Sequence, residues 1–76
     1  MDEKLLNRIE INPQVMFGKP VIKGTRLTVE IILEKLAYGE SEENIVEEYP
    51  FLKRADVKAA LLYAAKTVSL EEVFQA

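Results

Sequence analysis

The sequence contains no cysteine, no histidine and no tryptophan. Without cysteine, the chain can form neither a disulfide nor a thiolate metal site. Without histidine, it lacks the commonest metal ligand and the commonest general base, and its carboxylates follow no calcium-loop spacing. The sequence therefore indicates no metal site, no cofactor and no set of catalytic residues, and we predict that the protein is not an enzyme.

Long apolar runs are also missing. No stretch approaches the ~18 apolar residues of a membrane span, and the charged start MDEKLLNRIE contains no signal-peptide core. We therefore expect a cytoplasmic protein with no membrane contact. The 76 residues suffice for one small domain, residues 1–76. Because a core of this size contributes only roughly 3–5 kcal/mol and no disulfide supports it, we expect a homodimer.

The charges are unevenly distributed along the chain. The formal net charge of −3 argues against a general attraction to nucleic acid. Residues 27–52 hold seven Glu and one Lys, whereas residues 1–26 and 53–66 each hold more Lys and Arg than Asp and Glu. An acidic middle therefore lies between two basic stretches. We interpret the glutamates of SEENIVEEY as the solvated face of a short helix.

Residues 8–26 have the pattern of a short β-like arm. Ile9 and Ile11 alternate with charged residues, and Asn12-Pro13 is a turn signal. The stretch GKPVIKGTR at 18–26 raises the question of a phosphate-binding loop. A Walker loop requires G-x-x-x-x-G-K-[ST], whereas here the two glycines are six apart and Thr25-Arg26 follows the second. We therefore assign Gly18 and Gly24 a backbone role on either side of an extended segment.

Residues 28–68 change to a helical period and predict three helices. Thr28 is a good N-cap for the first helix, and Gly39 is placed to end it. Ser41 is a good N-cap for the second helix, which breaks before Pro50. The third helix is expected over about residues 54–68. Its predicted core stripe consists of Val57, Ala60, Leu61, Ala64 and Val68.

The last residues, 69–76, predict a separate short helical stub, because Ser69 and Glu72 have the spacing of a capping box. The middle of the chain is a short helix, a tight break and a longer helix, which is the length and order of a helix-turn-helix. We therefore predict a mostly α fold, in which a three-helix core follows a short N-terminal β arm or hairpin.

Basic residues cluster where a helix-turn-helix contacts DNA. Lys53, Arg54 and Lys58 lie at the start of the third helix, whose N-terminal residues would face base edges and phosphates. Three further cations of the β arm could assist by contacting DNA phosphates. They are Lys19, Lys23 and Arg26. The simpler interpretation of these arm residues is an ordinary solvated face.

The third helix is apolar nearly all round, which is typical of a helix packed on more than one side. Leu62 and Tyr63 lie off the core stripe and, with Leu70 and Phe74, are our candidates for a surface that binds another protein. The β arm, the stub, a second copy or another protein could cover this surface. The alternative to DNA binding is therefore a protein-interaction or dimerisation module that does not touch DNA.

The motifs GKPVIKGTR and EEYPFL, at this separation, resemble family 433 of the domains of unknown function over residues 8–65. The resemblance implies a homeodomain-like helix-turn-helix fold preceded by a short β segment. Family members are similar to VapB-type antitoxins and often lie beside a PIN-like nuclease toxin. An antitoxin of this class blocks its toxin and represses its own operon. The resemblance therefore implies operator DNA and a PIN-like nuclease toxin as partners, and our leading prediction is an antitoxin-like DNA-binding protein that represses its own operon and neutralises such a toxin. Where the family often has a Thr-type cap before the third helix, this chain has Lys53 and Arg54.

Overall fold

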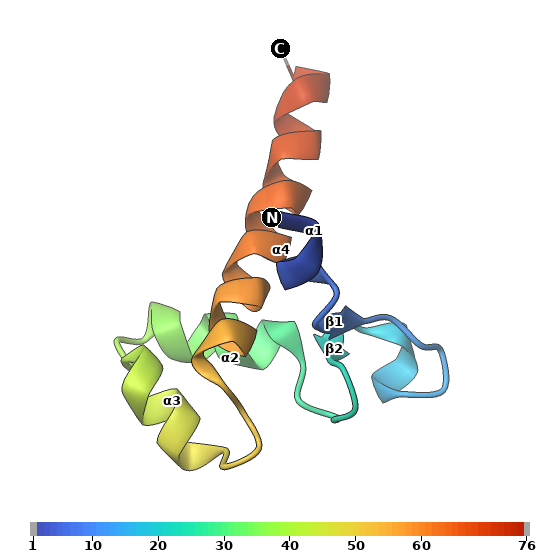
Figure 1. Ribbon diagram of the computed structural model, residues 1–76. Coiled ribbons are helices and arrows are strands. Elements are labelled where there is room, and N and C mark those ends of the chain that lie inside the picture. The colour runs from blue at the N-terminus through green and yellow to red at the C-terminus, as the bar shows by residue number, and fades with distance from the viewer. Residues whose placement is uncertain (1, 76) are drawn as a thin grey trace.

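Helices and one short antiparallel hairpin make up the computed structural model, which describes the backbone over residues 2–75 and the side chains over residues 4–69. The mostly helical fold with an N-terminal hairpin is confirmed (Figure 1). The elements in chain order are α1 (Asp2–Leu6), β1 (Ile9–Glu10), the 3-10 turn η1 (Met16–Gly18), β2 (Val21–Ile22), α2 (Val29–Ala37), α3 (Glu42–Glu48) and α4 (Arg54–Gln75).

The hairpin fastens the N-terminal segment to the helical core. Strand β1 pairs with β2 in antiparallel register, with Ile9 opposite Ile22. Both residues of β2 are buried. The Val29 amide, at the first residue of α2, donates to the Pro20 carbonyl over 2.9 Å. This bond and the hairpin register hold residues 18–29 in one defined path against α2.

The loop inside the hairpin has an unusual backbone. Met16, Phe17 and Gly18 all have positive φ values, of 49°, 58° and 83°. Glycine adopts this region freely, but each of the other two residues carries a cost on the order of 1 kcal/mol there. The Phe17 side chain is 96% exposed, so packing within this chain does not offset the strain.

The predicted caps of α2 and α3 are confirmed. Thr28 Oγ1 accepts from the Ile31 amide over 3.1 Å, and Ser41 Oγ accepts from the Asn44 amide over 3.1 Å. Gly39 has a φ of +97° immediately after α2, as a left-handed C-terminal residue should. These features form within four residues of chain, so the local sequence determines them.

The core lies where α2, α3, the hairpin and the first half of α4 meet. Its buried cluster consists of Ile22, Leu27, Val29, Ile32, Ile45, Leu52, Val57 and Ala60. The predicted stripe on α4 was partly wrong, because Leu61 and Val68 are 47% and 53% exposed whereas Ala59 is fully buried. The reason is tertiary: α1 and β1 also pack against α4, so its buried face is turned from the one expected (Figure 1).

Helix α4 is longer than the sequence pattern indicated. It continues through Ser69 to Gln75, so the stub expected at residues 69–76 is the last part of α4 rather than a separate helix. Its 22 residues span about 33 Å, and its C-terminal half projects beyond the rest of the molecule (Figure 1). Among residues 2–75 we find no helix with the length and apolarity that crossing a membrane requires.

Candidate functional site

Three of the six cations expected to contact DNA are held by glutamates. Arg54 Nη2 lies 3.2 Å from Glu43 Oε1, and Lys58 Nζ lies 3.6 Å from Glu42 Oε2. These pairs join the first turn of α3 to the start of α4. In the β arm, Lys19 Nζ lies 2.9 Å from an oxygen of Glu30. Exposed pairs of this kind add little stability, but they offset the positive charge available to a phosphate.

The other three cations form no ion pair within the described residues. They are Lys23, Arg26 and Lys53, and all three are exposed. They line two adjoining hollows that share Thr25 and the exposed ring of Phe51. We call the surface formed by Lys23, Thr25, Arg26, Phe51 and Lys53 the Phe51 surface.

The two hollows of the Phe51 surface differ in lining. Arg26 lines the first, of about 610 Å³, whose apolar walls include Leu27, Ile31 and Tyr49. Lys23 and Lys53 line the second, of about 280 Å³. The sequence assigned these cations either to a solvated arm or to the start of a DNA-reading helix. It did not predict that the fold gathers all three around one phenyl ring.

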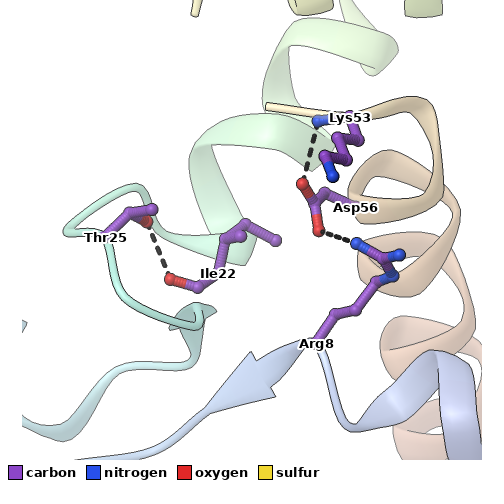
Figure 2. A network of polar contacts seen from close by, with 5 residues as sticks. All are labelled: Arg8, Ile22, Thr25, Lys53 and Asp56. Atoms are coloured by element: carbon purple, nitrogen blue, oxygen red, sulfur yellow. Dashed lines mark hydrogen bonds and ion pairs between the residues drawn. The ribbon is translucent and has the colours of Figure 1, made fainter. Parts of the chain in front are cut away.

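The loop that carries Lys23 and Arg26 is fixed by Thr25. Its hydroxyl donates to the Ile22 carbonyl over 2.8 Å and accepts from the Leu27 amide over 3.0 Å. Gly24, at a φ of +80°, provides the left-handed residue that this tight turn needs. Figure 2 shows the Thr25 hydroxyl directed at the Ile22 carbonyl.

The start of α4 is held by a residue that sequence reasoning did not single out. One oxygen of the buried Asp56 carboxylate accepts from the Lys53 amide over 2.9 Å, and the other lies 3.0 Å from Arg8 Nη1 (Figure 2). Asp56, the third residue of α4, thereby supplies the carboxylate half of a capping box, whose Thr-type half is missing at Lys53. An acidic residue three positions after Lys53 was the available signal.

A separate apolar groove lies between α2 and α4. It has a volume of about 420 Å³. Its apolar walls come from Pro20, Val29, Leu33, Tyr63, Ala64 and Val68. Lys19 and Glu30, which pair with each other, and Glu34 contribute polar groups to its lining. We call this feature the α2–α4 groove.

Of the four residues predicted to form a protein-binding surface, one lines the groove, one does not, and two have side chains outside the described residues. Tyr63 is half-buried, packs against the core and also lines the α2–α4 groove. Leu62 is half-buried and does not line that groove. The side chains of Leu70 and Phe74 lie outside the described residues.

The acidic middle of the chain is partly neutralised by Lys35. Its ammonium lies 3.0 Å from Glu48 and 3.4 Å from Glu40, and 5.7 Å from the centre of the Tyr49 ring. The hydrogen bond to Glu48 is the main reason why the pKa of Lys35 is raised above its usual value, and Glu40 adds to the effect. Lys35 thus ties α2 to α3. Within the described residues, no three carboxylates gather where they could hold a metal ion.

Comparisons with known proteins show the family to which the chain belongs. A crystal structure of a DUF433 member protein from Anabaena variabilis matches it with a TM-score of 0.78 and 28% sequence identity, over 90% of this chain and 67% of that one. An uncharacterised protein of Sinorhizobium fredii, y4eO, is 34% identical over 53 residues. Those residues are 70% of this chain but only 24% of y4eO, so the chain spans about a quarter of that relative. The model of the family described as "Protein of unknown function (DUF433)" matches residues 9–64, and the chain belongs to this family.

Proposed function

We propose that the protein is an antitoxin-like interaction module that binds and blocks a partner protein through the α2–α4 groove. The observation that carries the proposal is the composition of this groove. Its centre is apolar, and the Lys19–Glu30 pair and Glu34 contribute charge to its lining. An apolar centre with charged groups around it is the usual anatomy of a protein interface.

The shape of the groove favours a helical ligand. Helices α2 and α4 form most of its walls, with Lys19 and Pro20 beside them, and a groove between helices accepts the apolar face of an amphipathic helix. The partner that the family resemblance suggests is a PIN-like nuclease, whose activity the module would suppress. The proposal includes a second copy of this chain as another ligand of the groove. Binding of that copy would form the expected homodimer.

The test co-expresses the module with a PIN-like nuclease, taken from the neighbouring gene if that gene encodes one. Val68→Glu places a charge at the groove, whereas Leu61→Glu places the same charge on α4 at a residue that does not line it. Both residues are about half exposed, so both variants should fold. We expect Val68→Glu to release RNA cleavage from inhibition and Leu61→Glu to retain inhibition. Failure to form any complex, or equal inhibition by both variants, would contradict the proposal.

DNA binding through α3 and α4 is the second candidate function. The observation that favours it is a helix-break-helix unit, with Lys53, Arg54 and Lys58 at the start of its second helix. The glutamates that pair with Arg54 and Lys58 weaken its electrostatic basis. As an autorepressor, the protein would bind the DNA upstream of its own operon.

A gel shift on that upstream DNA, at two salt concentrations, tests this candidate. Changing Lys53, Arg54 and Lys58 together to Ala should lower the affinity and flatten its salt dependence, by a slope of roughly one per lost phosphate contact. If the triple change leaves both the affinity and its salt dependence unaltered, α4 does not bind DNA in this way.

A further inference from the structure

We propose that the Phe51 surface is a binding site for a single strand of nucleic acid. Lys23, Arg26 and Lys53 would contact phosphates, and one unpaired base would stack on the Phe51 ring. This site is distinct from the α2–α4 groove, with which it shares no lining residue. It shares Lys53 with the basic start of α4 but does not include Arg54 and Lys58, which pair with glutamates.

The positive charge of the Phe51 surface is the first feature that supports this proposal. A cation that already contacts a carboxylate must exchange that partner for a phosphate, whereas an unpaired cation keeps its full attraction. Lys23, Arg26 and Lys53 form no ion pair in the part of the chain that the structure describes. The carboxylate that lines their surface, Asp56, is matched by Arg8 at 3.0 Å. Nearby, Glu10 accepts from the Gly24 amide over 3.4 Å. Cations therefore outnumber carboxylates here, against the net charge of the chain.

The exposed Phe51 ring is the second feature that supports it. Phe51 is 54% exposed, although a phenyl ring gains from burial. Its centroid lies 5.9 Å from that of Tyr49, with the rings tilted by 59°, so the fold holds it in place from one side. A positioned, half-exposed aromatic ring among cations is how proteins bind single strands, because every base has a face that can stack.

The position of the cations relative to the Phe51 ring is the third feature that supports it. Phe51 lines both hollows, with Arg26 in one and with Lys23 and Lys53 in the other. A strand that places a base on the ring therefore meets cations on both sides of that base. The Thr25 hydroxyl fixes one wall, and Asp56 fixes the Lys53 amide in the other (Figure 2). Bases inside a duplex are already stacked on one another, which favours a single strand as the ligand.

The experiment measures fluorescence anisotropy of labelled oligo-dT and oligo-U of about 12 nucleotides with the full chain. Salt is varied from about 50 to about 200 mM. One variant removes the three cations of the Phe51 surface, Lys23→Gln, Arg26→Gln and Lys53→Gln. Its charge-matched control removes three exposed cations that line neither hollow and lie away from the start of α4, Lys4→Gln, Lys19→Gln and Lys66→Gln. We expect the first to lose affinity about tenfold or more and to lose salt dependence, and the control to stay within about twofold.

A second pair of variants tests stacking without changing charge. Phe51→Leu keeps an apolar side chain but removes the ring, and Phe17→Leu makes the same change at the other phenylalanine that is exposed within residues 4–69. We expect about a tenfold loss for the first and no change for the second. Circular dichroism melting of each variant establishes that it is folded. Val68→Glu should bind the oligonucleotide like the unmodified chain, so failure of the groove proposal leaves this one standing.

Four binding results and one competition result would overturn the proposal, the four binding results first. They are no measurable binding at the lower salt, equal losses for the two triple variants, an unchanged affinity for Phe51→Leu, and tighter binding of a duplex of the same length. A poly-glutamate peptide serves as a competitor. If it displaces the oligonucleotide at equal concentration of charges, the site binds acidic protein segments instead.

Discussion

The lysines and arginines of this chain differ in what lies beside each side chain. Lys35 contacts two glutamates and lies near an aromatic ring, and Arg54 contacts both acidic residues of the first turn of α3. Lys23 and Arg26 form no ion pair among the described residues. An attraction for phosphate therefore belongs to Lys23, Arg26 and Lys53 more than to Arg54 and Lys58, whose charge glutamates offset.

Replacing Phe17 with Asn should stabilise the fold by about 1 kcal/mol, because asparagine tolerates the left-handed region and phenylalanine does not. The Phe17 side chain is 96% exposed, so the change removes little packing. Urea unfolding checks the free energy. Phe51→Asn is the control, because that residue is exposed but has no positive φ. A loss of stability for Phe17→Asn larger than that for Phe51→Asn would contradict a strained turn.

Lys35 should make stability depend on alkaline pH. Its pKa is raised above the ordinary value of 10.5 in the folded chain, mainly by the Glu48 hydrogen bond. The stabilising contribution is therefore fully present below 10.5 and is lost as pH rises through the higher folded pKa. Urea unfolding of the unmodified chain and of Lys35→Met over this range should converge as pH rises. A constant difference between the two would show that Lys35 does not titrate in this way.

At the scale of elements, local signals were sufficient for the N-terminal caps of α2 and α3, but not for the end of α4, for α1 or for the packing of the helices. Thr28 and Ser41 were predicted as caps because a cap involves only the next three residues. The exposure of Leu61 and burial of Ala59 were not predicted, because α1 and β1 cover a second side of α4. The pairing of Arg54 with Glu43 likewise depends on how α3 folds back on α4.

The start of α4 should depend on one buried carboxylate. Asp56→Ala removes both the acceptor for the Lys53 amide and the partner of Arg8, so we expect a loss of about 2 kcal/mol. Arg8→Ala should cost less, because the Asp56 cap remains and the Arg8 side chain is partly exposed. Denaturant unfolding of the two single variants and the double variant measures both costs. An Arg8→Ala loss equal to that of Asp56→Ala would mean that the ion pair, and not the cap, carries the effect.

At the scale of the molecule, the fold presents two surfaces that differ in charge. The α2–α4 groove is mainly apolar, whereas the Phe51 surface collects cations that form no ion pair among the described residues, in a chain of net charge −3. The hairpin contributes to both, since Pro20 lines the groove and Lys23 lines the Phe51 surface. The segment GKPVIKGTR therefore provides residues to both surfaces. Only its turn-forming glycines, and not this placement, could be inferred from local spacing.

The projecting half of α4 should contribute to binding more than to folding. The core cluster on α4 ends at Ala60, with Tyr63 packed against it, and residues 65–69 are exposed. A chain shortened after Val68 should therefore keep its melting temperature within about 5 °C. The groove residues remain in this variant, so weaker inhibition of the co-expressed nuclease would assign the end of α4 to the same interface. A melting temperature lowered much further would instead show that residues after Val68 support the fold, because binding could then fail through unfolding alone.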